Sequence, residues 1–393
     1  MAVTLTNADN ALKSVYLDAI STQLNENVNP FLAAIEKSTN DVWGKEIRKL
    51  AIYGVNGGVG AGTEDGELPS AAGNNYSQFV TTLKNLYGVI EISDKAVRAS
   101  ENNAGAFVSL LNAEMDGLIK SSKFNFGRML FGDGSGKLAE VNAVPGNNVI
   151  VLDDYKNVIE GMMVDFRTKD GNLIDGATGR KILGVDRQGG AIMVGGEPLT
   201  LDTVPIGSIM TVQGSYNNEL TGLKAIFDTQ KQTLYGIDKG YNTWLNPYVL
   251  ESAGELSELK LQTALDAIEE SSGGQVNFIV CSWGVRRALQ KMFSTTKTNV
   301  GTMELAGGFN AMSYNGIPIV ADRFCPKGTM YLLNTNDFTL HQLCDWEWLV
   351  GDDGKVLKQV AGKPVYTATL VKYADLICSR PNGQGMISGI TEY

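Results

Sequence analysis

The stretch of residues 54–73 limits what this chain can fold into more than any other part of the sequence, because it cannot bury itself. It contains seven glycines in twenty residues, and no Lys or Arg occurs in residues 54–80. Glycine loses more conformational freedom on ordering than any other residue, and structureless loops beyond roughly 12–15 residues are uncommon unless they are functional or disordered. We therefore expect an outside surface to order this loop, most economically that of a neighbouring copy. Its apolar anchors are few: Val55, Val59, Leu68, Tyr76 and Phe79.

Bulk composition is that of an ordinary globular protein. At 393 residues the chain is long enough for two or three structural units, and 43% hydrophobic residues suffice for a substantial core. No run of about 18 apolar residues could cross a membrane. The start MAVTLTNADNALK lacks the charged beginning and apolar run of a signal peptide. We therefore expect a cytosolic origin and no membrane partner.

Cysteine spacing and net charge narrow the protein classes further. The cysteines lie far apart, without CxxC spacing or the density of a disulfide scaffold, so we expect reduced and mostly buried thiols. The net charge of −10 opposes tight binding to a nucleic-acid backbone over the whole surface, because such affinity comes from clustered Lys and Arg. A protein that encloses DNA remains consistent with this charge. The four cysteines are Cys281, Cys325, Cys344 and Cys378.

The first part of the chain is predicted to be an arm, followed by the glycine-rich loop and a long helix. Apolar residues at helical spacing predict a helix within residues 12–24, and Pro30 opens a second, short helix. Residues 43–53 and 87–92 are predicted to be extended. Three- and four-residue apolar spacing then predicts one helix over about residues 103–131, roughly 40 Å long at 1.5 Å per residue.

Between residues 137 and 220 the apolar period changes to two. Short β-type runs alternate with turn signals such as Pro145-Gly146 and Asp170-Gly171, which predicts a small β-barrel. Mixed structure then returns: a helix after Ser257, a strand VNFIVC, and a helix from Trp283. The barrel therefore reads as an insertion. Further strands are predicted at residues 317–320, 329–333, 338–350 and 366–371, before a glycine-rich tail.

The sequence gives little support for nucleotide binding or for a histidine-based metal site or catalytic site. Gly58 with Gly60 lacks the third glycine of a GxGxxG motif, as does Gly60 with Gly62, and acidic residues follow in place of a helix. His341 is the only histidine, which removes most His-based metal sites and His-relayed catalysis. It would lie about 13 Å from Asp345 on one strand, too far for a catalytic dyad. We expect an exposed structural histidine, no cofactor and no metal.

Asp345 and Glu347 are a candidate pair of catalytic carboxylates. On one strand face they would lie roughly 6.5–7 Å apart, within the range of the acid and base of a glycoside hydrolase. A sugar-stacking platform would need Trp346 and Trp348 on that face, and strand alternation turns them away. We therefore prefer a solvated strand face and a protein that is not an enzyme, with a carbohydrate-active hydrolase as the alternative of a different class. Arg286-Arg287 likewise favours exposed helical arginines over an anion site.

The order of these elements resembles that of the tailed-bacteriophage major capsid proteins. The shared features are an arm, a glycine-rich hairpin, a strand LYGVIEISDKAVRAS that runs into one very long helix, an α/β unit and terminal strands. This α+β fold, of the Hong Kong phage type, is shared with herpesvirus shells and encapsulins. The stretch FNAMSYNGIPIVADRFCPKGTMYLLN is also similar to a loose Y-x-G-x-P…D…P-x-G pattern of many phage capsid proteins, and physically it contains two β-turns.

The resemblance implies a division of the chain into six segments. They are an N-terminal arm (1–48), an extended E-loop hairpin (49–86), a P-domain with a long spine helix (87–136), an inserted small β-barrel domain (137–220), an A-domain (221–336), and a return to the P-domain with C-terminal strands (337–393).

The implied function is that of a major capsid protein, which self-assembles into hexamers and pentamers of the icosahedral head around the double-stranded DNA genome of a tailed bacteriophage. The DNA would be enclosed without tight binding. Other implied partners are a portal protein, a decoration protein on the barrel, and a separate scaffolding protein, since no scaffolding region precedes the arm. The expected location is the virion, after assembly in the bacterial host cytoplasm. An encapsulin-type compartment remains an alternative.

In the family, the arm and the E-loop reach over neighbouring subunits, and this implies contact residues here. Some members also cross-link their shells through an E-loop lysine, but the absence of lysine from residues 54–80 argues against this unless Lys49 or Lys84 serves. The expected inter-subunit contacts are Gly57, Gly60, Leu68, Tyr76 and Phe79 in the E-loop, and Tyr16, Ile20 and Phe31 in the arm.

Overall fold

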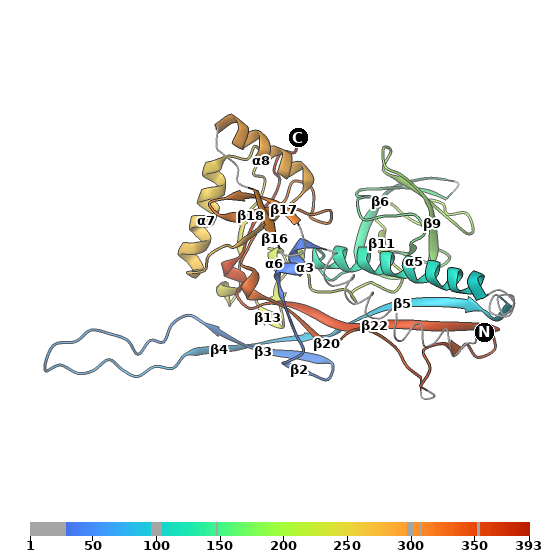
Figure 1. Ribbon diagram of the computed structural model, residues 1–393. Helices are drawn as coiled ribbons and strands as arrows, with labels where there is room; N and C mark the ends of the chain where they lie inside the picture. Colours follow the sequence, from blue (N-terminus) through green and yellow to red (C-terminus); the bar gives the residue numbers. More distant parts are fainter. Residues whose placement is uncertain (1–28, 96–103, 147, 297–301, 306–308, 352–353) are drawn as a thin grey trace. The chain divides into compact units, whose positions relative to one another are not determined.

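A computed structural model describes residues 29–95, 104–146, 148–296, 302–305, 309–351 and 354–393. The chain divides into two compact units, which Figure 1 shows in ribbon form. Unit 1 comprises Met1–Asn125 and Ile226–Tyr393, and unit 2 comprises Phe126–Ala225. The helix predicted within residues 12–24 lies outside the described residues. None of the described helices is long and apolar enough to cross a membrane.

Unit 1 opens with a short helix and a three-stranded sheet of order β2-β3-β4. The helix begins where the side-chain oxygen of Asn29 accepts hydrogen bonds from the backbone nitrogens of Phe31 and Leu32, with Pro30 in the first turn. The predicted short helix and the extended chain after it are confirmed. These elements are α3 (Pro30–Ala34), β1 (Glu36–Ser38), β2 (Val42–Trp43), β3 (Glu46–Tyr53) and β4 (Asn75–Thr82).

A long antiparallel strand pair of unit 1 and a long helix come next. β5 (Lys84–Ser93) pairs with β22 (Val365–Cys378) over ten residues without a register shift, and Figure 1 shows the two strands side by side. The predicted long helix is confirmed as α5 (Ala104–Leu130). A Cβ atom on Gly88 of β5 would lie 2.8 Å from a methyl carbon of Leu118, so only glycine allows this close approach between strand and helix.

The sheet that contains this strand pair has the order β1-β20-β22-β21, with β5 also paired to β22. β20 (Phe338–Trp348) runs parallel to β1 and antiparallel to β22, and it carries two register shifts between Gln342 and Glu347. β21 (Lys358–Gln359) pairs with Tyr366 and Thr367 of β22. Residues 338–342 are all buried, so both faces of the sheet are covered at that end of β20.

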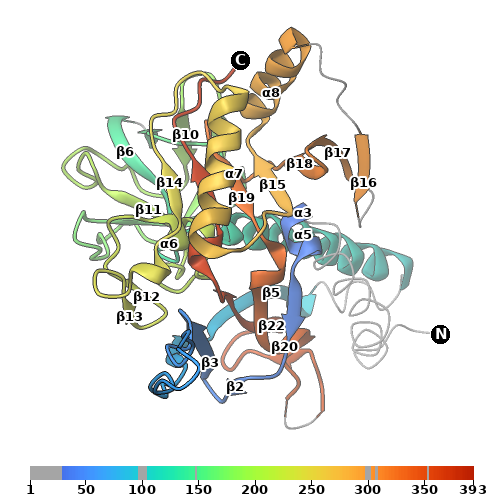
Figure 2. The same cartoon turned by 90° about the vertical axis from the view of Figure 1, so that its left-hand side faces the viewer.

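A second sheet of unit 1 has seven strands in the order β14-β23-β19-β15-β18-β17-β16. Side chains of α7 (Glu258–Ser272) and α8 (Trp283–Thr296) share one core cluster with this sheet, and Figure 2 shows the two helices beside its strands. Ser257 caps α7 as predicted, and Gly273 ends it in the left-handed conformation. The strands are β14 (Tyr248–Leu250), β15 (Phe278–Cys281), β16 (Thr302–Leu305), β17 (Phe309–Tyr314), β18 (Ile317–Ala321), β19 (Met330–Leu333) and β23 (Gly385–Ile387).

The glycine-rich tail contains a strand that the sequence did not predict. β23 pairs in parallel with β14 and antiparallel with β19, so it joins an edge strand to the middle of the seven-stranded sheet. Three residues are too few for an alternating pattern to be recognised. Smaller elements of unit 1 are β12 (Thr233–Leu234), β13 (Ile237–Asp238), η2 (Thr243–Leu245), η3 (Thr335–Asp337) and η4 (Pro381–Gly383), and α6 (Leu223–Phe227) begins in unit 2.

Unit 2 is built around a closed six-stranded barrel of order β10-β7-β6-β11-β8-β9. Alternate side chains fill its interior, among them Val141, Ile150 and Phe166, all fully buried. Asp165 satisfies two turns, because its carboxylate accepts hydrogen bonds from the backbone nitrogens of Gly179 and Gly214. The strands are β6 (Lys137–Gly146), β7 (Val149–Leu152), β8 (Met163–Arg167), β9 (Arg180–Asp186), β10 (Ala191–Val194) and β11 (Ile209–Val212).

A candidate assembly site on the β3–β4 hairpin

The hairpin formed by β3 and β4 has one buried and one exposed face. Its register runs from Glu46 opposite Thr82 to Tyr53 opposite Asn75 without a shift, so facing residues share a side of the ladder. Ile47 and Phe79 lie on the inner face, and both are fully buried. Ile52 and Tyr76 are direct cross-strand partners on the outer face, where they are 64% and 56% exposed; Leu50, two residues before Ile52, is 60% exposed. The outer face is therefore apolar and open to solvent.

An aromatic cluster anchors the base of the hairpin. The ring of Phe79 lies 5.3 Å from that of Tyr235 and 5.8 Å from that of Trp244, and Tyr53 stacks on Trp244 at 4.8 Å. These centroid distances are those of favourable aromatic pairs. The backbone nitrogen of Val80 donates to the carbonyl of Tyr235 at 3.0 Å. The chain beyond β12 is thus bound to β4 by both rings and backbone.

Polar contacts fix the same base to the β20–β22 sheet. The Thr81 hydroxyl donates to the carboxylate of Asp375 at 2.8 Å, and Asp375 is fully buried. The ammonium of Lys49 donates to the hydroxyl of Thr339 at 3.5 Å. The hydroxyl of Tyr235 accepts a hydrogen bond from the backbone nitrogen of Cys378, and burial raises the pKa of that phenol well above its ordinary value. The hairpin therefore leaves the body of unit 1 from a rigid base.

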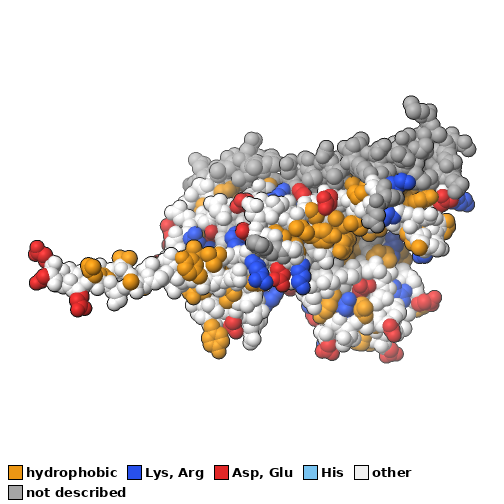
Figure 3. All heavy atoms as spheres, turned by 90° about the horizontal axis from the view of Figure 1, so that it is seen from below, with side chains coloured by type: hydrophobic (Ala, Val, Ile, Leu, Met, Phe, Trp, Pro, Cys, Tyr) orange, Lys and Arg blue, Asp and Glu red, His pale blue; other side chains and the backbone are white. Residues whose placement is uncertain are grey.

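The tip of the hairpin, residues 54–74, buries almost nothing. All of its residues are exposed except Gly58, which is half-buried. Its hydrogen bonds stay within the hairpin, for example from the Asn56 amide to the Asn74 side-chain oxygen at 3.1 Å. Val59 and Leu68 are 88% and 90% exposed. In Figure 3 the tip is the narrow extension, with acidic groups at its end and hydrophobic side chains along it. No contact within the described chain orders these apolar residues.

The structure separates the predicted contact residues into two groups. Gly57, Gly60, Leu68 and Tyr76 are exposed on the hairpin. Phe79 faces the interior of its own chain. It follows Tyr76 by three residues on β4, so strand alternation places the two side chains on opposite faces of the hairpin. It is an anchor of the base and is not available to a neighbour.

Of the predicted contact residues of the arm, the structure describes only Phe31. Phe31 is fully buried, with its ring 5.2 Å from that of Phe338, so it fastens α3 to β20 within one chain. Tyr16 and Ile20 lie outside the described residues. The sequence missed the role of Tyr235 and Trp244, whose only signal was an aromatic pair nine residues apart in a turn-rich segment.

The prediction of an exposed His341 is wrong. The side chain is 1% exposed, because β1 runs alongside β20 with Ser38 in register with His341, and both faces of β20 are covered there. Burial lowers the pKa of the imidazole below its ordinary value, with nearby Lys49 acting in the same direction. The histidine is therefore a neutral core residue at neutral pH.

Asp345 is not free to act as a catalytic carboxylate. Its carboxylate lies 2.6 Å from the ammonium of Lys372, which is fully buried and also donates to Gln342 at 2.7 Å. Burial lowers the pKa of Lys372, and Asp345 opposes that shift. Trp346 and Trp348 are buried on the other face, as predicted. The carboxylate is thus committed to a structural ion pair, which removes the basis of the hydrolase alternative.

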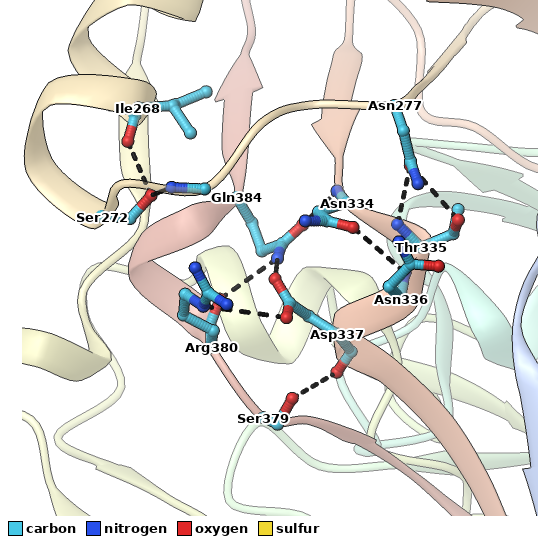
Figure 4. A network of polar contacts seen from close by, with 11 residues as sticks. Ile268, Ser272, Asn277, Asn334, Thr335, Asn336, Asp337, Ser379, Arg380 and Gln384 are labelled. Carbon is cyan, nitrogen blue, oxygen red and sulfur yellow. Dashed lines mark hydrogen bonds and ion pairs between the residues drawn. The ribbon is translucent and has the colours of Figure 1, made fainter. Parts of the chain in front are cut away.

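A polar network joins the five-stranded and the seven-stranded sheets of unit 1 (Figure 4). The side-chain amide of Gln384 donates to Asp337 at 3.0 Å, and its oxygen accepts from the backbone nitrogen of Asn334 at 2.8 Å. The side-chain oxygen of Asn277 accepts from the backbone nitrogen of Thr335 at 2.9 Å. Since these residues connect β19 to β20 and flank β15 and β23, the network fixes the seven-stranded sheet to the five-stranded one.

A family comparison agrees with this architecture. The family model described as SU10 major capsid protein matches residues 207–353, which run from β11 through α7, α8 and β20. This part of the chain is similar to that capsid protein family. A search of curated proteins finds no match to this chain.

Solved structures provide a fold-level comparison for this chain. The cyanophage A-1(L) capsid subunit superposes with a TM-score of 0.56 at 13% identity, over 94% of this chain and 92% of that chain. A Mycobacterium phage Adephagia chain reaches 0.47 at 7% identity, over 94% and 92%. The SrpI encapsulin of Synechococcus elongatus PCC 7942 reaches 0.45 at 10% identity, over 93% and 90%. The likeness to the cyanophage subunit supports the predicted α+β capsid fold.

Proposed function

We propose that this chain is a major capsid protein that self-assembles into hexamers and pentamers of an icosahedral head. We also propose that the β3–β4 hairpin is its E-loop, which reaches over a neighbouring subunit. One observation carries the proposal. The hairpin has a base fixed by Phe79 and Tyr235, yet its outer face presents Leu50, Ile52 and Tyr76 to solvent. A hairpin with a fixed base and an unburied apolar face is suited to cover a second copy of the chain.

The free energy available from this face is appropriate for assembly. Fully burying a large apolar side chain contributes roughly 1.5–3 kcal/mol, so the exposed parts of Leu50, Ile52 and Tyr76 together offer about 3–5 kcal/mol per hairpin. A single contact of that size is weak in isolation. Because each subunit of a closed shell both gives and receives such a contact, many weak contacts add to a stable particle.

The net charge, and a sequence in which no motif favours catalysis or nucleotide binding, support the wider role. A net charge of −10 suits a container that encloses double-stranded DNA without adhering to it. We assign the protein a structural role without catalysis, a place in the virion, and assembly in the bacterial host cytoplasm. A separate scaffolding protein and a portal protein are its expected partners, and the outer surface of the unit 2 barrel is the proposed position for a decoration protein.

Deletion of residues 59–71 tests the proposed function. The strands β3 and β4 and the aromatic base remain, so the purified variant is expected to be folded, with unchanged circular dichroism and melting temperature, but unable to form shells. The full-length chain, with a scaffolding partner supplied equally to both, is the control. Shells of normal size and yield from the deletion variant, seen by electron microscopy and sedimentation, would exclude the hairpin as an assembly element.

A further inference from the structure

One strand of the unit 2 barrel contains a β-bulge. In the pairing of β9 with β10, Met193 lies opposite Gly184 and Val194 lies opposite Ile182, so the register skips Leu183. An extra residue of this kind changes the direction of the side chains that follow it, and such bulges occur often next to functional sites. The alternation of β9 between its two faces therefore restarts after Leu183.

The restarted alternation gives β9 one face in the core and one exposed face. Ile182 and Val185 belong to the barrel core. Lys181, Leu183 and Asp186 are exposed. In a strand without a bulge, Lys181 and Asp186 would point to opposite faces, because they are five residues apart. The bulge thus brings a basic, an apolar and an acidic side chain to the same face of the barrel.

The centre of this face is apolar and uncovered. Leu183 is 55% exposed, and Met193 on the neighbouring strand is 47% exposed. A Cβ atom on Gly195 would lie 3.6 Å from a methyl carbon of Leu183, and one on Gly184 would lie 3.9 Å from the terminal carbon of Met193. Because these glycines have no side chains, they leave both apolar groups open. We call the set the β9 row: Lys181, Leu183, Asp186 and Met193.

The two ends of the β9 row carry opposite charges. Within the part of the chain that the structure describes, neither Lys181 nor Asp186 forms an ion pair. The backbone nitrogens of Gly189 and Gln188 donate to the carboxylate of Asp186, and these hydrogen bonds lower its pKa, so the group is charged at neutral pH. The row therefore runs from a positive end through an apolar centre to a negative end.

A surface with this layout is complementary to itself. If a two-fold axis passes between Leu183 and Gly184, two copies of β9 run antiparallel across the contact. Lys181 of each copy then faces Asp186 of the other, because both positions are equally far from the axis, and the apolar centres meet. Such a contact is isologous. In the parallel orientation like charges would meet, which disfavours that alternative.

We propose that the β9 row of one copy docks on the β9 row of a second copy across a two-fold axis. This inference rests on the proposed function, and it adds a second contact surface that lies wholly on unit 2. A closed barrel has no free strand edge, so a partner must use a face of this kind.

The size of the β9 row determines when the contact forms. Each partner of a stable protein pair buries roughly 800 Å² of its surface, far more than four partly exposed side chains supply. We therefore expect no dimer of the free chain. The contact should form only in the assembled particle, where two copies are held close together and many weak contacts add.

Cysteine cross-linking in assembled particles tests the contact. One variant carries Lys181→Cys and the other carries Asp186→Cys. Position 181 of each copy faces position 186 of the other in the proposed contact, so neither variant alone brings two introduced thiols together. A one-to-one mixture, treated with a short bifunctional maleimide, is expected to give cross-linked dimers on a denaturing gel, and each variant alone should give none. The wild type measures the background, since its four cysteines lie in unit 1.

Charge substitutions provide a second test that preserves the turn after β9. Lys181→Glu places acid opposite acid, so it should lower the temperature at which particles dissociate, measured by light scattering. Adding Asp186→Asn removes this repulsion and keeps a side-chain oxygen for the turn, so it should restore most of that temperature. Lys169→Glu, at an exposed position of unit 2 outside the β9 row, is the matched control and should behave like the wild type.

The outcomes separate this contact from the hairpin proposal. No dimers in the mixture, or the same yield from each variant alone, would overturn the contact. An equal loss of particle stability with and without Asp186→Asn would also overturn it. The hairpin proposal would then still stand, provided that wild-type particles form and the deletion of residues 59–71 blocks them. If the wild-type chain forms no particles, the proposed function fails and this inference fails with it.

Discussion

Replacing Ile52 by alanine isolates the contribution of the outer hairpin face to assembly. Ile52 is 64% exposed and lies directly opposite Tyr76 on the outer face of the hairpin. Burying the whole of such a side chain contributes roughly 1.5–3 kcal/mol, so covering the part that is exposed here contributes about 1–2 kcal/mol at each contact. Since 1.4 kcal/mol is a factor of ten, the Ile52→Ala chain should need about 5–30 times more protein to assemble.

The stability of the unassembled chain should hardly change, because surface substitutions away from special features stay within about 0.5 kcal/mol. Light scattering and sedimentation give the concentration at which half of the protein assembles, with the same scaffolding supplement throughout. Leu173→Ala is the matched control, since Leu173 is 53% exposed on unit 2, outside the proposed contact. If the two variants assemble at the same concentration, the reasoning about the outer face is refuted.

Three further predictions concern contacts inside unit 1. Phe79→Ala removes the anchor of the aromatic base and should lower the free energy of unfolding by about 3–5 kcal/mol in urea titrations; a loss below 1 kcal/mol would contradict its role. Asp345→Asn should cost about 2–4 kcal/mol, somewhat less than for a fully buried pair because the carboxylate is 35% exposed, and adding Lys372→Met should recover most of the loss. Burial raises the pKa of Asp337 above 3.8, so the carboxyl group holds its proton more tightly in the folded state than in the unfolded state. The free energy of unfolding should therefore fall as the pH rises through the pKa of the folded state. Asp337→Asn should remove that fall, which urea titrations between pH 4 and 7 can test.

The long elements of this fold could be predicted because their patterns are long. α5 repeats its apolar spacing over seven turns, and the capping residue Ser257 and the terminating glycine of α7 have direct physical roles at helix ends. The unburied loop could be predicted for a different reason. Its composition offers nothing with which to form a core, and the structure leaves residues 54–74 almost entirely exposed.

The errors concern which face of a strand is covered, a property of tertiary packing that alternation alone does not contain. Phe79 looked like part of the loop, yet Tyr235 and Trp244, far away in the sequence, cover it. His341 lay on a polar face in the pattern, but residues 338–342 are all buried, so both faces of β20 are covered at that end. Among the candidate contact residues, the sequence correctly predicted the exposure of Leu68 in the tip and of Tyr76 on the outer face. Their contact with a neighbouring subunit stays a prediction.

The way in which the chain enters and leaves unit 2 has a consequence for engineering. Arg128 and Glu219, both almost fully buried, form a two-pronged ion pair across the incoming and outgoing segments. A Cβ atom on Gly222 would collide with the carbonyl oxygens of Met129, Leu130 and Gly132, so the two segments touch at a glycine. The segments that enter and leave the barrel region therefore lie side by side. A foreign domain with adjacent termini could replace residues 137–218 there, which keeps Glu219 paired with Arg128, and each particle built from such chains would carry many ordered copies of the guest.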